Sequence, residues 1–195
     1  MRLFLCILTA LFAGSPGYIL TNDNLSGPPT ADVFPHEGVI ILNSFPKAGR
    51  YTDSEGKEFS YGITRTTLMN VSENSLQLTI HFPADSFAFV TFPGSYVKLF
   101  LLPDSISFNY IPFNNSSWYI SDGLKPFLDA GLHTPTSRQE IISAKQERIF
   151  YIAALYHKTA GVPTAELVLK EQNLFFRPGR LDSLLITCGK VLFKE

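Results

Sequence analysis

The chain has 195 residues, of which 45% are hydrophobic and 17% are charged, and its formal net charge is −1. This composition excludes an intrinsically disordered chain, and the length suits one domain with a buried core. Lys and Arg are neither in excess nor clustered, so a phosphate backbone has no electrostatic attraction to the protein and nucleic acid is not an expected partner. The 17 Phe and eight Tyr residues favour β-sheet, in which aromatic side chains pack well across strands.

The N-terminus has the order of a secretory signal peptide. A positive start at Arg2 precedes an apolar run over residues 3–12, and small residues follow at positions 13–15. This order predicts a signal peptide over residues 1–17, and the alternative is a first buried strand or helix of the fold. The apolar run is too short to cross a bilayer core of about 30 Å, so no transmembrane helix is expected in the mature chain.

Residues 18–35 are polar and rich in Gly, Pro, Asn and Asp, which predicts a flexible linker before a single folded domain over residues 36–195. Removal of the signal peptide would take Cys6 with it and leave Cys188 without a partner for an internal disulfide. Exported eukaryotic domains more often carry paired cysteines, so we expect a bacterial protein of the periplasm, the cell envelope or the extracellular medium. Sequons of the form Asn-x-Ser begin at Asn24, Asn70, Asn114 and Asn115, and they matter only in a host that glycosylates.

Two stretches define the expected sheet. Residues 76–82 alternate apolar with polar side chains, which predicts a strand with one buried face. Residues 96–102 are apolar on both faces except at Lys98, which predicts a strand covered on both sides. Further strands are predicted at 37–42, 59–68, 87–92, 105–111, 118–120, 165–170, 173–176 and 181–187, with Gly189 ending the last of these before a final apolar run at 191–193. Residues 47–57 read as a polar turn region.

Helical signals are few. Residues 122–131 combine an acidic cap with apolar side chains at helical spacing, which predicts one short helix. Residues 137–163 allow a helix, since they begin with a capping box and end with Gly and Pro. However, a polar block at 145–148 is followed by an apolar run at 149–156, and a helix should instead show one apolar stripe. We therefore expect a buried strand over residues 148–157.

A hairpin turn at residues 159–163 would then connect this strand to the one at 165–170. Turn signals recur roughly every eight to fifteen residues, and the helices that parallel βαβ units require are missing. The sequence therefore predicts an all-β fold, an antiparallel β-sandwich of Ig-like or jelly-roll-like type, with at most one or two short helices.

The sequence offers no recognisable catalytic motif, metal site or cofactor site. No two of the four histidines lie within four residues of each other, and neither a Gly-x-Ser-x-Gly elbow nor a phosphate-binding loop is present. Cys188 lies in a strand-like stretch and reads as a buried structural thiol, although a fold that placed it beside His157 could make a nucleophile pair. Acidic residues are scattered singly, and only the fold could bring two of them to the spacing of about 5–10 Å that glycoside hydrolysis needs. They include Asp85, Asp104, Asp122, Asp129, Glu140, Glu147, Glu166, Glu171 and Asp182.

Binding is the remaining kind of function. Tyr110, Trp118 and Tyr119 surround a polar turn at 114–117, where exposed rings could stack on a sugar or a peptide. Alternatively, Trp118 and Tyr119 face opposite sides of a strand and one of them fills the core. The leading hypothesis is an exported, non-catalytic β-sandwich domain with a binding or cell-envelope role, whose partner is a protein or a glycan. The alternative is a secreted carbohydrate-active hydrolase, and a third option is a subunit that pairs through an edge strand.

Overall fold

The computed structural model of the protein describes residues 30–34, 38–106, 108–110, 118–120, 123–159, 165–179 and 184–194. The strands are β1 (Thr30–Phe34), β2 (Val39–Asn43), β3 (Lys47–Thr52), β4 (Glu58–Asn70), β5 (Leu76–Phe82), β6 (Phe87–Ala88), β7 (Tyr96–Leu101), β8 (Phe108–Tyr110), β9 (Trp118–Ile120), β10 (Thr136–Ile142), β11 (Glu147–His157), β12 (Glu166–Lys170), β13 (Asn173–Arg177) and β14 (Ile186–Phe193). The helix of these described ranges is α1 (Leu124–Gly131).

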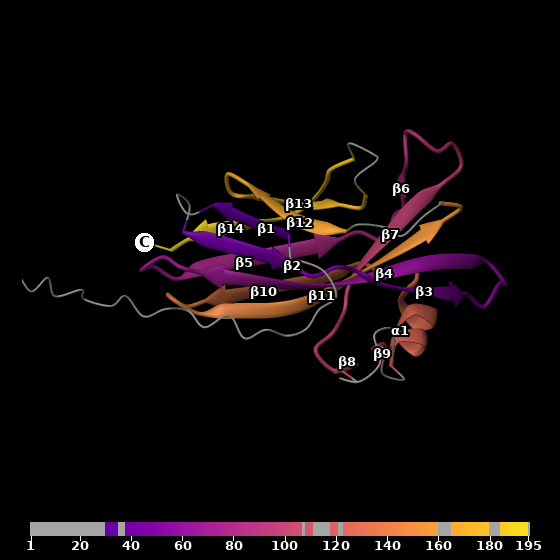
Figure 1. Cartoon of the computed structure of the whole chain (residues 1–195), viewed down its shortest axis with the longest axis horizontal. Helices are drawn as coiled ribbons and strands as arrows, with labels where there is room; N and C mark the ends of the chain where they lie inside the picture. The colour runs from indigo at the N-terminus through magenta and orange to yellow at the C-terminus, as the bar shows by residue number, and fades with distance from the viewer. Residues whose placement is uncertain are drawn as a thin grey trace, which may run out of the picture.

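The strands form two antiparallel sheets that pack face to face (Figure 1). Sheet A has seven strands in the order β1-β2-β4-β11-β7-β6, with β3 also paired to β4. Sheet B has five strands in the order β10-β5-β14-β13-β12, and β8 with β9 forms a separate two-stranded ribbon. The predicted all-β antiparallel sandwich with one short helix is confirmed.

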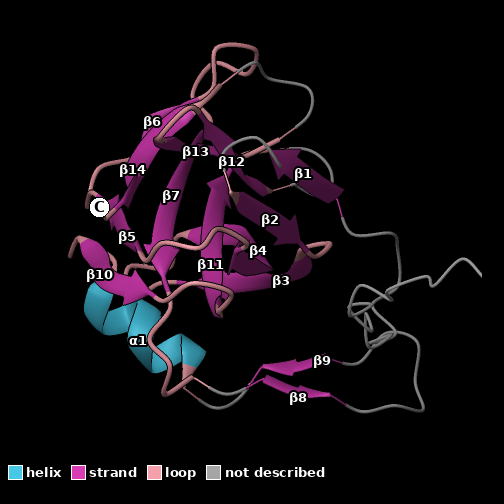
Figure 2. Cartoon of the chain, turned by 90° about the vertical axis from the view of Figure 1, so that its left-hand side faces the viewer, coloured by secondary structure: helices cyan, strands magenta, loops and turns pink. Residues whose placement is uncertain are grey.

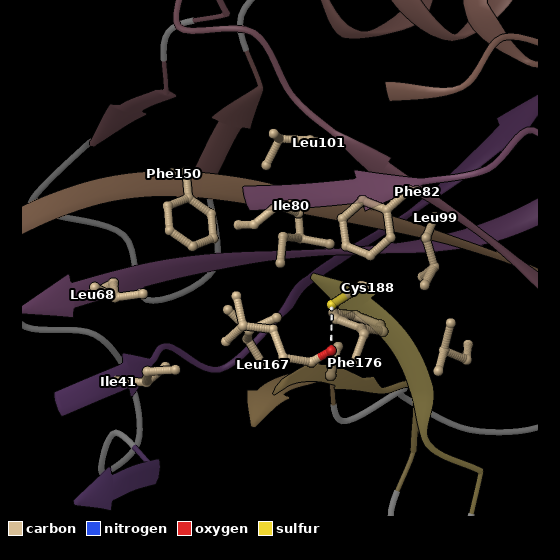
Figure 3. Close-up of a cluster of buried hydrophobic side chains, with 14 of the residues drawn as sticks. Ile41, Leu68, Ile80, Phe82, Leu99, Leu101, Phe150, Leu167, Phe176 and Cys188 are labelled. Atoms are coloured by element: carbon tan, nitrogen blue, oxygen red, sulfur yellow. Dashed lines mark hydrogen bonds between the residues drawn. The ribbon is translucent and has the colours of Figure 1, made fainter. Parts of the chain in front are cut away.

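The main core lies between the two sheets and is built by period-two alternation. In β5, the four apolar residues predicted to face inward are fully buried, while the residues between them are half-buried or exposed. They meet inward-facing side chains of sheet A such as Leu68, Leu99 and Phe150 (Figure 3). Burying each such side chain contributes about 1.5–3 kcal/mol, so this layer holds the two sheets together.

The opposite face of sheet A is also covered, in part by α1, which both views show outside the sandwich (Figures 1 and 2). Leu124 and Leu128 of the helix are buried in a second apolar cluster together with Phe100 of β7. The prediction that the strand at 96–102 is covered on both sides is therefore confirmed. Lys98, the exception in that strand, donates from Nζ to the carbonyl oxygens of Ala84 at 3.2 Å and Leu132 at 3.0 Å.

In its described part, residues 137–159, the ambiguous stretch consists of two strands joined by a turn and contains no long helix. β10 and β11 replace the alternative helix, and β11 is buried on both faces over most of its length. The predicted hairpin between residues 148–157 and 165–170 is wrong, because β11 lies inside sheet A while β12 lies at an edge of sheet B. Both edges of β11 are already hydrogen-bonded, to β4 and β7, so β12 has no free edge of β11 to pair with.

Other boundaries also differ from the expectations. Part of the expected linker, β1, pairs with β2. The expected turn region at 47–57 is shorter than predicted, because β3 and β4 form a hairpin around Asp53, whose carboxylate accepts the backbone N–H of Lys57 at 2.8 Å. The strand predicted at 87–92 is limited to β6. Of the strand predicted at 105–111, residues 108–110 form β8, residues 105–106 lie in a turn, and residues 107 and 111 are outside the described ranges.

Gly189 does not end a strand, and β14 runs through it. A Cβ atom at this position would collide with the backbone carbonyl oxygen of Thr79 in the neighbouring β5. The glycine is therefore required by the close approach of two backbones, which is the other common reason for glycine inside a strand.

Candidate functional site

The aromatic residues predicted to bind a ligand lie on the β8–β9 ribbon. The backbone register places Tyr110 opposite Trp118, and Tyr119 opposite Asn109. The polar turn that was expected to present them, at 114–117, lies outside the described residues. Two of the three predicted residues are thus cross-strand partners, and their role as a binding platform stays a prediction.

The structure shows a pocket at one end of the sandwich, above the edge of the buried core. We call it the end pocket, and its volume is about 670 Å³. It lies at the end of the molecule at which Figure 1 marks the C-terminus. Its described lining residues are Gly38, Val39, Val71, Ser72, Asn74, Leu169, Glu171, Gln172, Val191 and Phe193.

Four separate segments build the end pocket: the start of β2, the turn from β4 to β5, the turn from β12 to β13, and the end of β14. Val39, Leu169 and Val191 lie beneath the pocket in the buried core and are at most 1% exposed, so the apolar side chains open to a ligand are the half-buried Val71 and Phe193. The rim is polar and consists of Ser72, Asn74, Glu171 and Gln172. A ligand would therefore meet a small apolar surface, formed by Val71 and Phe193, beside hydrogen-bonding groups.

The walls of the pocket are tied to one another. The backbone N–H of Val71 donates to the carbonyl of Gly38 at 2.9 Å, and that of Val191 donates to the carbonyl of Gln172 at 2.9 Å. Gly38 has φ +70°, and a Cβ there would come within 2.8 Å of the Ser72 Cβ. Only glycine fits this turn without strain, so the entry of the chain into β2 and the β4–β5 turn are fitted to each other.

Asn70 holds the β4–β5 wall from inside. Its side chain is 1% exposed, and its Nδ2 lies within hydrogen-bond distance of the carbonyl oxygens of Asn74 (2.8 Å), Ser143 (3.0 Å) and Ile142 (3.1 Å). Its Oδ1 accepts the backbone N–H and the hydroxyl of Ser72 at 3.1 and 2.7 Å. Asn70, the first residue of one sequon, is thus buried and hydrogen-bonded in the folded protein. Its side-chain amide fixes the conformation of the β4–β5 turn and therefore of this part of the pocket rim.

The chemistry of the end pocket suits binding better than catalysis. Glu171 is the one ionisable group among its described lining residues. An apolar cleft with a few fixed polar groups is the usual form of a ligand site, with volumes of about 300–1,000 Å³. A single carboxylate beside valine, leucine and phenylalanine side chains does not make an acid–base pair.

The structure brings two of the scattered carboxylates together elsewhere. Arg148 contacts Asp104 at 2.6 Å and Glu140 at 3.1 Å, and Arg138 contacts Asp104 at 2.6 Å. The hydrogen bond from Arg138, with further help from Arg148, lowers the pKa of Asp104. A general acid needs a raised pKa, so Asp104 is not suited to that role. It belongs instead to an ion-pair cluster that joins β10 of sheet B to β11 of sheet A.

Cys188 and His157 lie apart on different layers. Cys188 is 3% exposed, its Sγ donates to the carbonyl of Leu174 at 3.5 Å (Figure 3), and burial raises the pKa of its thiol to about 12. His157 lies on the other face of sheet A, beside the rings of Tyr96 and Phe59 at 5.0 and 5.6 Å. The prediction of a buried structural thiol is confirmed, and the described residues contain no group of His, Cys, Asp and Glu side chains that could hold a metal ion.

The chain matches no protein-family model, no curated protein and no solved structure. Within the described residues, no helix has the length and apolar character needed to cross a membrane. The case for a function therefore rests on the geometry of the molecule itself, and above all on the end pocket.

Sequence reasoning missed the end pocket. Its lining comes from four segments separated by up to about 150 residues, and no local motif connects them. The one usable signal was the dense polar turn at 70–74, where two asparagines and a serine suggest a side-chain-bonded loop rather than an ordinary hairpin.

Proposed function

We propose that the protein is an exported, non-catalytic binding domain that holds an apolar or amphipathic group in its end pocket. The observation that carries this proposal is a pocket in which Val71 and Phe193 give accessible apolar surface beside a polar rim, and whose β4–β5 wall is pre-organised by Asn70. Export rests on the signal-peptide pattern of residues 1–17, which lie outside the described part of the structure.

The apolar surface and the rim would contribute to binding in different ways. Apolar surface that a ligand buries on the half-buried side chains of Val71 and Phe193 contributes about 25 cal/mol for each Å² removed from water. The rim orients the ligand, because Ser72, Asn74 and Gln172 offer both donors and acceptors. A rim that is already ordered loses little conformational entropy when a ligand enters, which leaves more of the contact energy available as affinity.

Of the two predicted partner classes, this pocket favours a protein segment over a glycan. Sugar rings are typically held by flat aromatic surfaces, and Phe193 is the one aromatic side chain among the described lining residues. The accessible apolar side chains, Val71 and Phe193, instead match the aliphatic or aromatic side chains of a peptide. The hydrolase alternative has weaker support, because the carboxylates that lie near each other are neutralised by Arg138 and Arg148.

Binding can be tested with an environment-sensitive hydrophobic fluorophore titrated into the purified protein. We expect saturable fluorescence in the wild type and its loss in Gln172→Trp, because Gln172 is exposed on the rim and an indole there would fill the pocket. The matched control is Gln139→Trp, which makes the same change at an exposed position of β10 outside the pocket lining. Equal fluorophore binding by both variants would remove the end pocket as the site.

Export can be tested separately, by fractionating an expressing cell and sequencing the N-terminus of the mature protein. We expect a new N-terminus close to residues 13–17 in the exported fraction. Leu8→Arg places a charge in the apolar run and should retain the full-length chain inside the cell. An exported protein that still begins at Met1 would contradict the signal-peptide assignment.

A further inference from the structure

Glu171, the one ionisable residue among the described lining residues of the end pocket, has a strained backbone. It is the first residue of the two-residue turn 171–172 between β12 and β13, and its φ is +57°. A residue with a side chain rarely adopts this left-handed conformation, and glycine is the usual residue where a turn requires it. Glycine would relieve this strain, so the reason for a glutamate at this position has to lie in its side chain.

Lys145 shows how a side chain can account for a similar backbone conformation. It has φ +60° in the turn between β10 and β11, and its ammonium contacts the Glu73 carboxylate at 2.7 Å and a backbone carbonyl oxygen of the β4–β5 turn at 2.8 Å. Lys158, which also has a positive φ, adjoins residues 160–164, outside the described ranges. The Glu171 carboxylate has no hydrogen bond or ion pair within the described part of the chain. Its charge is therefore available to a ligand.

The remaining described charged side chains near the turns at this end of the sandwich lie outside the pocket lining. Glu73 and Lys145 form an ion pair with each other. Lys170 lies over the Phe175 ring, with 5.9 Å between Nζ and the ring centroid, and Lys194 is exposed beyond the end of β14. The described lining of the end pocket therefore carries one negative charge and no positive charge.

The apolar surface beside this charge is small. Val71 and Phe193 are half-buried, whereas Val39, Leu169 and Val191 beneath them are at most 1% exposed. Hydrophobic contact alone therefore gives little affinity, and attraction to the carboxylate on the rim sets which ligands are preferred. A short alkyl chain that ends in an ammonium group matches both features, because its carbon atoms cover apolar surface while its charge stays in contact with water at the rim.

We propose that the end pocket selects cationic ligands and binds a lysine side chain of a protein segment, whose ammonium pairs with the Glu171 carboxylate. This inference rests on the proposed binding function of the end pocket and names the chemical class of its ligand. A free alkylamine offers the same chemistry, so the group that the pocket recognises is an ammonium on an alkyl chain. Glutamate is then kept at a strained position because of its charge.

The test uses three forms of one environment-sensitive fluorophore, in which the same alkyl chain ends in an ammonium, a methyl or a carboxylate group. We expect the purified protein to bind the ammonium form about two- to fivefold more tightly than the methyl form, which is the size of effect that an ion pair at an exposed site produces. The carboxylate form should bind more weakly than the methyl form. Salt at about 1 M should remove most of these differences, because the Debye length then falls to about 3 Å.

Two substitutions test the role of Glu171. Glu171→Gln keeps the shape of the side chain and should remove the difference between the ammonium and methyl forms. Glu171→Gly should also remove it and should leave Tm unchanged or higher, because glycine relieves the left-handed backbone. The matched control Glu55→Gln neutralises an exposed carboxylate in the turn between β3 and β4, at the other end of β4 from the pocket, and should keep the difference. A preference that Glu171→Gln retains, or a lower Tm in Glu171→Gly, would overturn the proposal.

The three probes also separate this proposal from the one on which it rests. Equal binding of all three forms, lost in Gln172→Trp, would overturn the selection of cations and leave the end pocket as a binding site. Binding of none of them would overturn both proposals. Competition for the ammonium form then distinguishes the two sources of the cation. A lysine-containing peptide that competes more strongly than a free alkylamine supports a protein segment, and the reverse order would overturn that assignment.

Discussion

The side-chain amide of Asn43 makes hydrogen bonds to the outer edge of sheet B that a neighbouring strand would otherwise make. β12 is an edge strand, yet its Leu167 is bonded on both backbone groups, because Nδ2 of Asn43 donates to the Leu167 carbonyl at 2.9 Å and Oδ1 accepts the Leu167 N–H at 3.1 Å. Oδ1 also accepts the hydroxyl of Thr66 at 3.0 Å. Asn43 is 1% exposed and belongs to β2 of sheet A, so this contact joins the two sheets and closes an edge that could otherwise pair with another chain.

Replacing Asn43 with alanine should therefore destabilise the protein strongly. The change leaves the N–H and the carbonyl of Leu167 without partners in a buried position, and each such group costs about 1–3 kcal/mol. The methyl group also leaves a small void where the amide was. We expect a loss of about 3–5 kcal/mol, which is a large part of the 5–15 kcal/mol that stabilises a typical domain. The control Asn173→Ala, at a half-buried outward position on β13, should stay within about 0.5 kcal/mol.

Urea unfolding followed by tryptophan fluorescence or circular dichroism measures this difference in the free energy of unfolding. For a chain of this length, 1 kcal/mol lowers Tm by roughly 2–4 °C, so Asn43→Ala should lower Tm by about 6–20 °C. Hydrogen exchange adds a local measure, since the Leu167 amide should exchange much faster in the variant. A loss below about 1 kcal/mol together with unchanged exchange at Leu167 would refute the role assigned to Asn43.

Three further predictions concern single groups. Gly189→Ala should cost roughly 1–3 kcal/mol in urea unfolding, because its methyl group meets the Thr79 carbonyl, whereas Gly131→Ala in open space should be neutral or slightly stabilising. The Arg138 contact lowers the folded pKa of Asp104 below its ordinary value of 3.8, so its stabilisation is present above that value and is lost as the pH falls through the lowered pKa. Asp104→Asn should therefore differ slightly in stability from the wild type at pH 6 and not at pH 2; an equal difference at both would exclude this cause. Cys188 should react with a thiol reagent only as fast as the protein unfolds, and rapid labelling under native conditions would contradict its burial.

The fold class could be predicted because the residue types along a strand indicate which of its faces are buried. The alternation in β5 specified one buried face, and the apolar character of β7 on both faces specified that both are covered. The apolar run of β11 excluded an amphipathic helix for the same reason. In each case burial is read directly from the chemistry of consecutive residues.

Strand pairing could not be predicted in the same way. Period two states which face of a strand is buried, but it does not state which neighbour the strand bonds, because the backbone groups that form the ladder are the same in every residue. The adjacency of residues 148–157 and 165–170 therefore suggested a hairpin, while the structure sends β12 to the other sheet. Gly189 was read as the end of a strand because a sequence does not show that the Thr79 carbonyl lies beside it.

The structural features of this protein divide in the same way, into those that depend on one short segment and those that depend on the tertiary structure. The sequence by itself determined an all-β body and a buried thiol at Cys188, since each depends on residue type within short segments. Only the tertiary structure decided where the end pocket lies and that Asn43 bonds the outer edge of sheet B. These features arise where segments distant in the chain meet, and their distances depend on how the two sheets stack rather than on any local pattern.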